Sequence, residues 1–478
     1  MDARVPQTER TVYVDLDGTL IHSDLLWETL FLTARQDPML LAKVPLWLSR
    51  GKAQLKAELA RNVSFDASAL PYRQEVVDEL RALRANGRRI VLATGSNERL
   101  AHAVASHLGL FDDVMASNDE VNLTSTRKLE RIEAEAGDAG YDYFGNSHED
   151  ICLLENAAEA TVVAPDKTAD RWQKRTGSAR IDHEKGRLKA AIKAMRPHQW
   201  SKNVLVFVPM VLTHEFLNLE MMWASLLAFI SFSAAASSVY IVNDLLDLEA
   251  DRRHKTKRNR PFASGRLSIP TGLKMALALI AISSAAAALL PITYAVVLVG
   301  YLVATTAYSI ALKRMLLVDV MTLAFLYTTR IIAGAEASGV GVSFWLLSFS
   351  IFFFLSLALV KRYTELQDYG KEASRATTGR GYVNADLETL GQMGMSSGFA
   401  AVLVLALYIN SPEVAAHYDI PYLVWPLCPL VLYIISRIWI LARRDQMHED
   451  PVVFILQDWR SQMMMGLGGL MFLGAVYV

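Results

Sequence analysis

The stretch Asn243-Asp-Leu-Leu-Asp-Leu-Glu-Ala-Asp251 places three aspartates at the end of a long apolar segment, and a basic tail follows them at residues 252–260. On a helix, Asp244, Asp247 and Asp251 fall at positions i, i+3 and i+7, so their carboxylates share one face and repel one another unless a cation joins them. Carboxylate oxygens suit a hard cation that also contacts substrate phosphates. The pattern therefore predicts magnesium and phosphate binding beside a membrane. A charged, solvated helix end is the alternative interpretation.

Apolar runs long enough to cross a bilayer begin near residue 203, whereas charged residues recur every few positions before about residue 186. At 478 residues the chain is long enough for two or three domains. We therefore predict a soluble domain over residues 1–185 and an all-α polytopic membrane domain over residues 186–478. Nine spans are expected, at residues 203–220, 222–242, 272–290, 292–312, 316–336, 344–361, 395–411, 421–442 and 461–478.

The distribution of charge and cysteine narrows the partners and the location. Lysine and arginine follow the second, fourth, sixth and eighth predicted spans and are missing from the intervening loops, which predicts a cytoplasmic N-terminal domain and, for nine spans, a C-terminus on the opposite side of the cell membrane. The polar residues 1–10 do not resemble a cleaved signal. The net charge is −1 and the basic residues lie beside carboxylates, which argues against nucleic acid as a partner. Cys152 and Cys428 fall in different domains, so neither a disulfide framework nor a cysteine zinc site is expected.

Two further polar clusters flank predicted spans on the same side. The sequence Arg-Pro-His-Gln-Trp-Ser-Lys-Asn at residues 196–203 follows a basic amphipathic stretch suited to the membrane surface, and residues 361–368 follow the sixth predicted span. Their side chains could converge with the aspartates on one diphosphate, with metal ions bridging carboxylate and phosphate. Surface anchoring and ordinary loop solvation are the alternatives.

Residues 243–251 match the N-D-x-x-D-x-x-x-D motif of the UbiA superfamily of intramembrane prenyltransferases, which residues 186–478 resemble. The resemblance implies a bundle of nine helices with a central cavity, a lateral opening to lipid, and magnesium-dependent chemistry near the cytoplasmic surface. The usual second motif, D-x-x-x-D, is replaced here by Lys-Arg-Tyr-Thr-Glu-Leu-Gln-Asp at residues 361–368. Motifs at residues 196–203, 256–261, 308–313 and 361–365 are similar to those of the polyprenyl-phosphate phosphoribosyltransferases, the branch that makes decaprenyl-phosphoryl-ribose phosphate.

In that branch, the resemblance implies that the phosphate of a polyprenyl phosphate attacks C1 of phosphoribosyl diphosphate and that magnesium-bound diphosphate leaves. The lipid phosphate is already ionised, so positioning and charge stabilisation would carry the rate. Asp244, Asp247 and Asp251 are implied to hold metal and diphosphate. The implied substrate-binding residues are Arg196, Lys202, Asn203, Asn243, Lys257, Arg258, Arg260, Lys361, Arg362, Tyr363 and Glu365. The alternative reaction is prenyl transfer from a prenyl diphosphate to an aromatic or other acceptor.

The N-terminal part has the pattern of an α/β, Rossmann-like domain. Residues 11–17, Thr-Val-Tyr-Val-Asp-Leu-Asp, predict a buried strand that ends in aspartates, and open α/β sheets place their sites at the carboxyl ends of strands. Further strands are expected at residues 89–94, 113–117, 141–145 and 161–164, with helices between them, which predicts a parallel, doubly wound sheet. Residues 25–70 predict a small helical cap. Residues 166–185 show no clear apolar period and are expected to form a linker.

Asp-x-Asp-Gly-Thr at residues 15–19, Thr94, Lys128, and Gly-Asn-Ser-His-Glu-Asp at residues 145–150 resemble the four motifs of the haloacid dehalogenase superfamily of phosphatases. The resemblance implies that Asp15 attacks phosphorus and Asp17 protonates the leaving group, while Thr94 and Lys128 bind the phosphoryl oxygens. It also implies magnesium on Asp15, the Asp17 carbonyl and the fourth motif.

The fourth motif departs from the usual pattern, because Asn146 stands where an aspartate is common. An amide oxygen can ligate magnesium but carries no charge, and Asp150 is the candidate to compensate. The domain is therefore either an active phosphatase or a non-catalytic regulatory module. The fusion suggests consecutive steps, in which the membrane domain makes a polyprenyl-phosphoryl 5-phosphoribose and the soluble domain removes the 5-phosphate.

Overall fold

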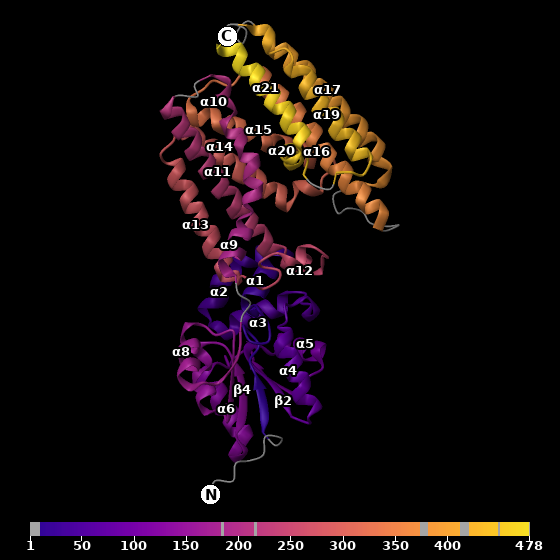
Figure 1. Ribbon diagram of the computed structural model, residues 1–478. Helices are drawn as coiled ribbons and strands as arrows, with labels where there is room; N and C mark the ends of the chain where they lie inside the picture. The colour runs from indigo at the N-terminus through magenta and orange to yellow at the C-terminus, as the bar shows by residue number, and fades with distance from the viewer. Residues whose placement is uncertain are drawn as a thin grey trace. The chain divides into compact units, whose positions relative to one another are not determined.

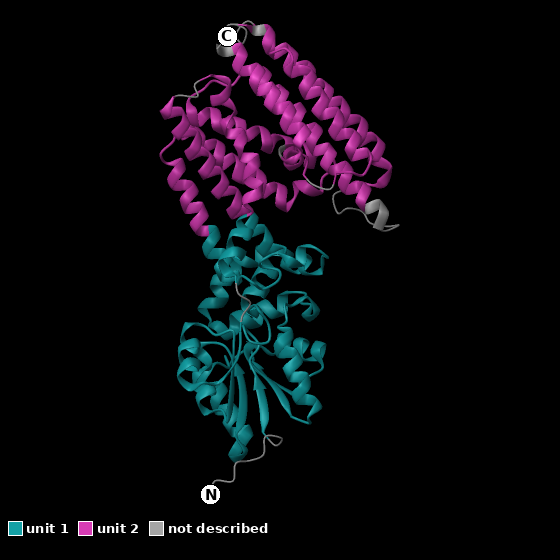
Figure 2. Ribbon diagram, viewed as in Figure 1, with its two compact units in different colours: residues 1–195, 240–276 teal, residues 196–239, 277–478 magenta. Residues whose placement is uncertain are grey.

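The computed structural model describes residues 10–182, 186–214, 218–372, 381–411, 420–447 and 450–477. The chain forms two compact units (Figure 2): unit 1 contains residues 1–195 and 240–276, and unit 2 contains residues 196–239 and 277–478. The sequence suggested one boundary near residue 186. In the structure, residues 240–276, which include the aspartate-rich stretch and its basic tail, belong to the same compact unit as the N-terminal domain.

A six-stranded parallel sheet forms the centre of unit 1, with helices on both faces (Figure 1). Its strand order is β3-β2-β1-β4-β5-β6, which confirms the predicted parallel α/β fold. Val12 and Val14 of β1 pack into the hydrophobic layer on one face, and Tyr13 packs into the layer on the other, as the alternation of a strand requires. The strands are β1 (Thr11–Val14), β2 (Ile90–Asn97), β3 (Asp113–Ser117), β4 (Tyr141–Gly145), β5 (Glu159–Val163) and β6 (Ala179–Ile181). The helices beside them are α4 (Gln74–Ala85), α5 (Glu98–Leu108), α6 (Ser125–Ala136), α7 (Ile151–Asn156) and α8 (Lys167–Thr176).

The expected linker over residues 166–185 is wrong for most of its length. Asp166 caps α8 by accepting hydrogen bonds from the N–H groups of Thr168 and Ala169, and Trp172 of this helix is buried. The short strand β6 then pairs with β5 and extends the sheet. Surface-facing charges on α8 hid its one buried side, so the apolar period was too weak to detect.

The insertion between β1 and α4 is helical, as predicted. Trp47, Leu55 and Leu59 form its small hydrophobic cluster. Its elements are α1 (Leu25–Gln36), the 3-10 helix η2 (Pro38–Lys43), α2 (Val44–Ser49), α3 (Lys52–Asn62) and the 3-10 helix η3 (Ala67–Ala69). We call residues 25–70 the cap.

Six helices in the described part of the chain are long and apolar enough to cross a membrane, so the protein is a multi-pass membrane protein. They correspond to the second to seventh predicted spans. These helices are α11 (Leu219–Leu246), α13 (Ile269–Ala287), α14 (Ile292–Ile310), α15 (Val318–Ser338), α16 (Phe344–Glu372) and α17 (Leu387–Ile409).

The expected count of nine spans is not confirmed within the part of the chain that the structure describes. The eighth and ninth predicted spans correspond to the helices α19 (Leu427–Arg443) and α21 (Trp459–Tyr477), which are not among the six. The first predicted span is wrong, because residues 197–207 form a 3-10 helix, η6 (Pro197–Phe207), followed only by α10 (Val208–Leu212). Pro209 lacks an N–H and lies in the first turn of α10, where no intrahelical hydrogen bond needs that group.

Side-chain hydrogen bonds hold η6 inside unit 2. Trp200 Nε1 donates to the Ser237 hydroxyl at 2.9 Å, and Asn203 Nδ2 donates to the Ser233 hydroxyl at 3.0 Å. The apolar side chains of η6 therefore pack inside unit 2 and do not form a membrane span. The remaining short elements are α9 (Arg187–Met195), α12 (Leu248–Arg253), α20 (Pro451–Gln457) and the 3-10 helices η7 (Lys257–Asn259), η8 (Leu312–Arg314), η9 (Asn384–Asp386) and η10 (Pro421–Leu423).

Candidate active sites

The first candidate site lies where β1 and β4 end, in unit 1. Asp15 follows β1 directly, and its backbone N–H donates to the Phe144 carbonyl at 2.9 Å. The ammonium group of Lys128, on α6, lies 2.8 Å from Asp15 Oδ1 and also donates to the Tyr143 hydroxyl at 3.0 Å. Both charged side chains are buried. The structure thus brings together the predicted nucleophile and the predicted phosphate-binding lysine.

Asp150 organises this site through its hydrogen bonds. Its Oδ1 accepts from the Tyr143 hydroxyl at 2.8 Å and lies 3.5 Å from Lys128 Nζ. Its Oδ2 accepts from the backbone N–H groups of Asn146 and Ser147, each at 3.1 Å. Protein donors therefore reach both oxygens of Asp150, which holds the lysine and the loop of the fourth motif in place.

Asn146 lies beside the first motif. Gly18 has a φ of +78°, and a Cβ atom built on it would lie 2.1 Å from Asn146 Nδ2, so this amide rests directly on the loop that carries Asp15 and Asp17. No three His, Cys, Asp or Glu side chains of the described ranges lie close enough together to form a metal site alone. A magnesium site here would therefore combine Asp15 with the Asn146 amide and a backbone carbonyl, all of which are hard oxygen donors.

Asp17 is held by two donors that fix its orientation. Its Oδ1 accepts from the Leu25 N–H at 2.8 Å, and its Oδ2 accepts from the Ser96 hydroxyl at 2.6 Å. Burial and the nearby Asp24 carboxylate raise the pKa of Asp17 to about 7. Burial also raises the pKa of Asp15 to about 7, although Lys128 opposes this shift. A carboxyl group that keeps its proton near neutral pH suits the predicted role of Asp17 as a proton donor.

Thr94 is completely buried within β2, where its hydroxyl accepts from the Ser96 N–H at 3.0 Å. The next residue, Gly95, lines the cavity that contains Asp15 and Asp17. This cavity has a volume of about 840 Å³. It therefore lies in the upper part of the range of roughly 300–1,000 Å³ that small-molecule sites occupy.

The second candidate site is the aspartate-rich stretch, also in unit 1. Asp244 lies in the last turn of α11, and Asp251 lies in α12. Both carboxylates are buried, and both approach the same nitrogen of Arg260, at 3.1 Å from Asp244 Oδ1 and 2.7 Å from Asp251 Oδ2. The guanidinium nitrogen thus stands as the positive charge between two carboxylates, where a bound cation would otherwise be expected.

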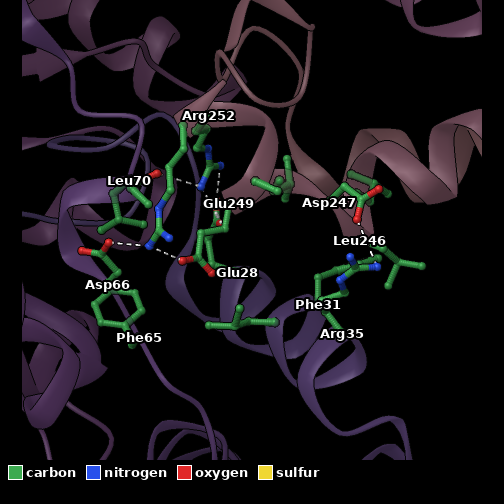
Figure 3. Close-up of a pocket in the computed structure, with 16 residues that line it drawn as sticks. Glu28, Phe31, Arg35, Phe65, Asp66, Leu70, Leu246, Asp247, Glu249 and Arg252 are labelled. Carbon is green, nitrogen blue, oxygen red and sulfur yellow. Dashed lines mark hydrogen bonds and ion pairs between the residues drawn. The ribbon is translucent and has the colours of Figure 1, made fainter. Parts of the chain in front are cut away.

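Asp247 turns toward a different partner. It is the residue at which α11 gives way to α12, and its Oδ1 lies 3.1 Å from a guanidinium nitrogen of Arg35 on α1 of the cap (Figure 3). Of the three aspartates that the sequence placed on one face, only Asp244 and Asp251 share a partner in the structure. The backbone carbonyl of Asn243 accepts a hydrogen bond from the Asp247 N–H. Lys257 and Arg258 are exposed residues of the basic tail.

Arg252 joins the aspartate-rich stretch to the cap (Figure 3). Its two terminal nitrogens lie 2.6 and 3.1 Å from the two Glu28 oxygens, which makes a bidentate ion pair with both side chains nearly buried. Its Nε donates to the Ala263 carbonyl at 3.1 Å. Arg253 forms a second ion pair with the cap, at 2.6 Å from Asp66. The cap and residues 247–263 are therefore one packed body within unit 1.

Unit 2 contains a third group of predicted residues. Lys202 of η6 and Lys361 of α16 both approach Asp450 Oδ2, at 2.6 and 3.2 Å. Asn203 accepts from Arg330 Nε at 2.8 Å. The structure thus brings Lys202 and Lys361 together, and both lysines share one carboxylate.

Arg362 is fully buried in unit 2. It lies 2.8 Å from Asp319, which also accepts from the Tyr382 hydroxyl, and it forms an ion pair with Glu365. Tyr363 packs edge-on against a tryptophan of α19. Arg362 is therefore a fixed interior charge, whereas Lys361 is partly exposed.

Sequence reasoning missed several charged residues near these sites. Arg330 and Asp319 lie within the predicted fifth span, and single charges inside an apolar helix are a signal that we did not use. Arg196, in contrast, was predicted as a phosphate ligand, and in the structure it ends α9 with a left-handed backbone conformation. Ser96 lies in the same motif as Thr94 but was given no role, and Asp450 gave no signal because it belongs to no recognisable motif.

A parallel α/β domain with a buried Asp–Lys pair, followed by several apolar helices, defines a multi-pass membrane protein fused to a phosphatase-like domain. Two family models match the chain. The model of the UbiA prenyltransferase family matches residues 204–457, and the model of haloacid dehalogenase-like hydrolases matches residues 12–155. The chain belongs to the UbiA prenyltransferase family and carries a haloacid dehalogenase-like domain at its N-terminal end.

Three relatives cover different shares of the chain. The chain is 38% identical over 454 residues to the uncharacterized protein y4nM of Sinorhizobium fredii, a match that covers 94% of this chain and 87% of that protein. It is 37% identical over 284 residues to the nodulation protein NoeC of Azorhizobium caulinodans, covering 59% of this chain and 92% of NoeC. It is 39% identical over 179 residues to the decaprenyl-phosphate phosphoribosyltransferase of Mycobacterium tuberculosis, covering 37% of this chain and 59% of that enzyme. This last match is partial for both proteins.

Proposed function

We propose that this protein transfers 5-phosphoribose from phosphoribosyl diphosphate to a polyprenyl phosphate, and that its N-terminal domain then removes the 5-phosphate of the product. The similarity to the decaprenyl-phosphate phosphoribosyltransferase carries the choice of reaction. The buried carboxylates of Asp244 and Asp251, which both approach Arg260, also support this reaction. The diphosphate leaving group is an anion, and carboxylates can hold the cation that it needs.

In the transfer step, an oxygen of the lipid phosphate forms a bond to C1 of the ribose, and the bond from C1 to the diphosphate breaks. The lipid phosphate is ionised, so no side chain has to take a proton. Magnesium would stabilise the charge of the leaving diphosphate, and Asp244, Asp247 and Asp251 are the residues proposed to hold it. Arg258 and Arg260 of the basic tail are proposed to bind phosphate oxygens in unit 1, and Lys202 and Lys361 are proposed as a separate phosphate-binding group in unit 2.

The proposed phosphatase step also follows from named residues. Asp15 attacks the phosphorus of the 5-phosphate, while Asp17 gives its proton to the departing ribose oxygen. Lys128 neutralises the phosphoryl oxygens beside Asp15. Water then hydrolyses the aspartyl phosphate and releases phosphate and free Asp15. The buried pair of Asp15 and Lys128 and the fixed orientation of the Asp17 carboxyl group support this assignment over a purely regulatory domain.

We also propose the orientation that the loop charges favour, with the phosphatase-like domain in the cytoplasm and the C-terminus on the opposite side of the membrane. In this orientation, phosphoribosyl diphosphate, a soluble substrate, would reach the aspartate-rich stretch from the side on which it is made.

Mass spectrometry of the lipid products tests the proposal. Purified protein would receive magnesium, a polyprenyl phosphate and phosphoribosyl diphosphate, and in parallel a prenyl diphosphate with aromatic acceptors. A phosphoribosylated lipid that loses one phosphate over time is the expected result. The Asp15→Asn protein should accumulate the product that still carries its 5-phosphate. Formation of a prenylated aromatic alone would replace the proposal with the alternative prenyl transfer.

A further inference from the structure

The cavity around Asp15 has a polar end and an apolar wall. Its polar end contains the charged and amide groups of Asp15, Asp17, Lys128 and Asn146. Its wall is built by two segments outside the N-terminal domain as the sequence predicted it, namely α9 and the residues that lead into α13. All of these residues belong to unit 1.

The apolar wall is made of side chains that a soluble sugar phosphate would not need. Leu188 and Ala191 come from α9, Leu267 precedes α13, and Ile269 and Pro270 begin it. The same two segments also line the cavity with the polar residues Arg187, Arg266, Ser268 and Thr271. Because α13 is one of the six candidate membrane spans, this part of the wall continues directly into a helix suited to the bilayer. The cavity thus joins a phosphate-binding end to a surface that can accept apolar groups.

Packing fixes this wall to the phosphatase-like domain. Gly265 has a φ of +74°, and a Cβ atom built on it would lie 2.2 Å from the Cβ of His22, so the two backbones approach closely. Leu267 and Ile269 are nearly fully buried. Leu188, in contrast, is 76% exposed although it lines the cavity, so an apolar group at this position meets solvent unless a ligand covers it.

We infer that the phosphatase site selects a phosphomonoester carried by a membrane-anchored isoprenoid over a soluble sugar phosphate, and that Leu188 and the start of α13 provide this selectivity. The inference rests on the proposed phosphatase activity and adds the residues that recognise the lipid. The first isoprene units beyond the phosphate on C1 would lie on the apolar wall, while the 5-phosphate faces Asp15. The lipid tail would then stay with the bilayer during hydrolysis.

The test compares kcat/KM for two substrates, the polyprenyl-phosphoryl 5-phosphoribose in detergent and ribose 5-phosphate. We expect the wild-type protein to prefer the lipid. The variant Leu188→Ser should lose about tenfold in kcat/KM on the lipid, as expected for one apolar side chain, and keep its rate on ribose 5-phosphate. The matched control is Ile192→Ser, one turn further along α9, which removes an exposed apolar side chain that does not line the cavity. It should change neither rate.

Each other outcome has a separate meaning. Equal wild-type rates on the two substrates would overturn the inference while keeping the phosphatase activity. Equal losses in Leu188→Ser and Ile192→Ser would also overturn it, because α9 would then act only as a surface anchor. Hydrolysis of neither substrate by the wild-type protein would instead refute the proposed phosphatase function itself.

Discussion

The two acidic sites of unit 1 differ in how their carboxylates are neutralised. In the phosphatase-like site, Asp15 meets a lysine that is itself buried and held by Tyr143 and Asp150. In the aspartate-rich stretch, Asp244 and Asp251 meet Arg260, and Asp247 meets Arg35, two arginines that are about one third exposed. The first site is preorganised by an internal network. The second is neutralised by partly exposed arginines, which would have to move aside for the proposed metal and diphosphate to bind.

Replacing Lys128 with Met should have the largest effect. It would leave the buried Asp15 and Asp150 without their cation, which costs about 3–5 kcal/mol of folding free energy for a broken buried pair and should abolish phosphatase activity. Thermal denaturation in detergent and hydrolysis of a small phosphate ester measure the two effects. The control Lys174→Met removes an exposed ion pair with Asp170 and should leave both unchanged. Normal stability of the Lys128 variant would show that the network is not required for folding.

Asp244→Asn should reduce the transfer reaction by about 10²–10³-fold, the range seen when one group that stabilises transition-state charge is removed. Hydrolysis of a small phosphate ester should stay at the wild-type rate, since Asp244 lies outside the phosphatase cavity. Lipid product formation and ester hydrolysis are measured on the same preparation. Loss of both activities in this variant would mean that the phosphatase-like site depends on the aspartate-rich stretch, although different basic residues neutralise the two sites.

The two reactions should also differ in their pH dependence. The pKa of Asp17 is raised to about 7, so its carboxyl group is protonated below that pH and loses its proton as the pH rises. A reaction that needs this proton should therefore fall by about tenfold per pH unit above 7 for an ester with a poor leaving group. The transfer step needs no protein acid and should lack this decline. A phosphatase rate that stays constant to pH 9 would argue against Asp17 as the proton donor.

Arg35→Gln should have the smallest effect. Its pair with Asp247 is partly exposed, so we expect a change of only about two- to fivefold in the KM for phosphoribosyl diphosphate. Arg50→Gln, which changes an exposed arginine of the same cap away from this pair, is the control. A larger loss than that of Asp244→Asn would identify Arg35 as part of the substrate site rather than as a resting partner of Asp247.

Local patterns predicted much of this architecture. Two strands, β3 and β4, were predicted to the residue. The resemblance to the haloacid dehalogenase motifs singled out Asp15, Lys128 and Asn146, and these residues line one cavity. The sheet brings them together at the carboxyl ends of its strands, as expected for this fold.

Other features depended on tertiary packing and had no local signal. The segment at residues 197–207 overlaps the start of the first predicted span, but it is a 3-10 helix in which Trp200 and Asn203 hydrogen-bond to serine hydroxyls inside unit 2. The sharing of Asp450 by two lysines joins residues 248 positions apart. The wall that residues 265–271 add to the phosphatase cavity is equally non-local, since it joins segments that the sequence assigned to different domains.

The bidentate pair between Arg252 and Glu28 has a consequence for dissecting the protein. Glu28 lies in the N-terminal domain and is nearly buried, but its positive partner comes from a segment more than two hundred residues later. A fragment cut after residue 185 would keep the carboxylate and lose the cation, and it would also lose the wall around Gly265. Residues 1–185 and the rest of the chain are therefore not independent domains connected by a flexible linker. A chimera that takes residues 1–185 from a relative would need a matching pair at positions 28 and 252.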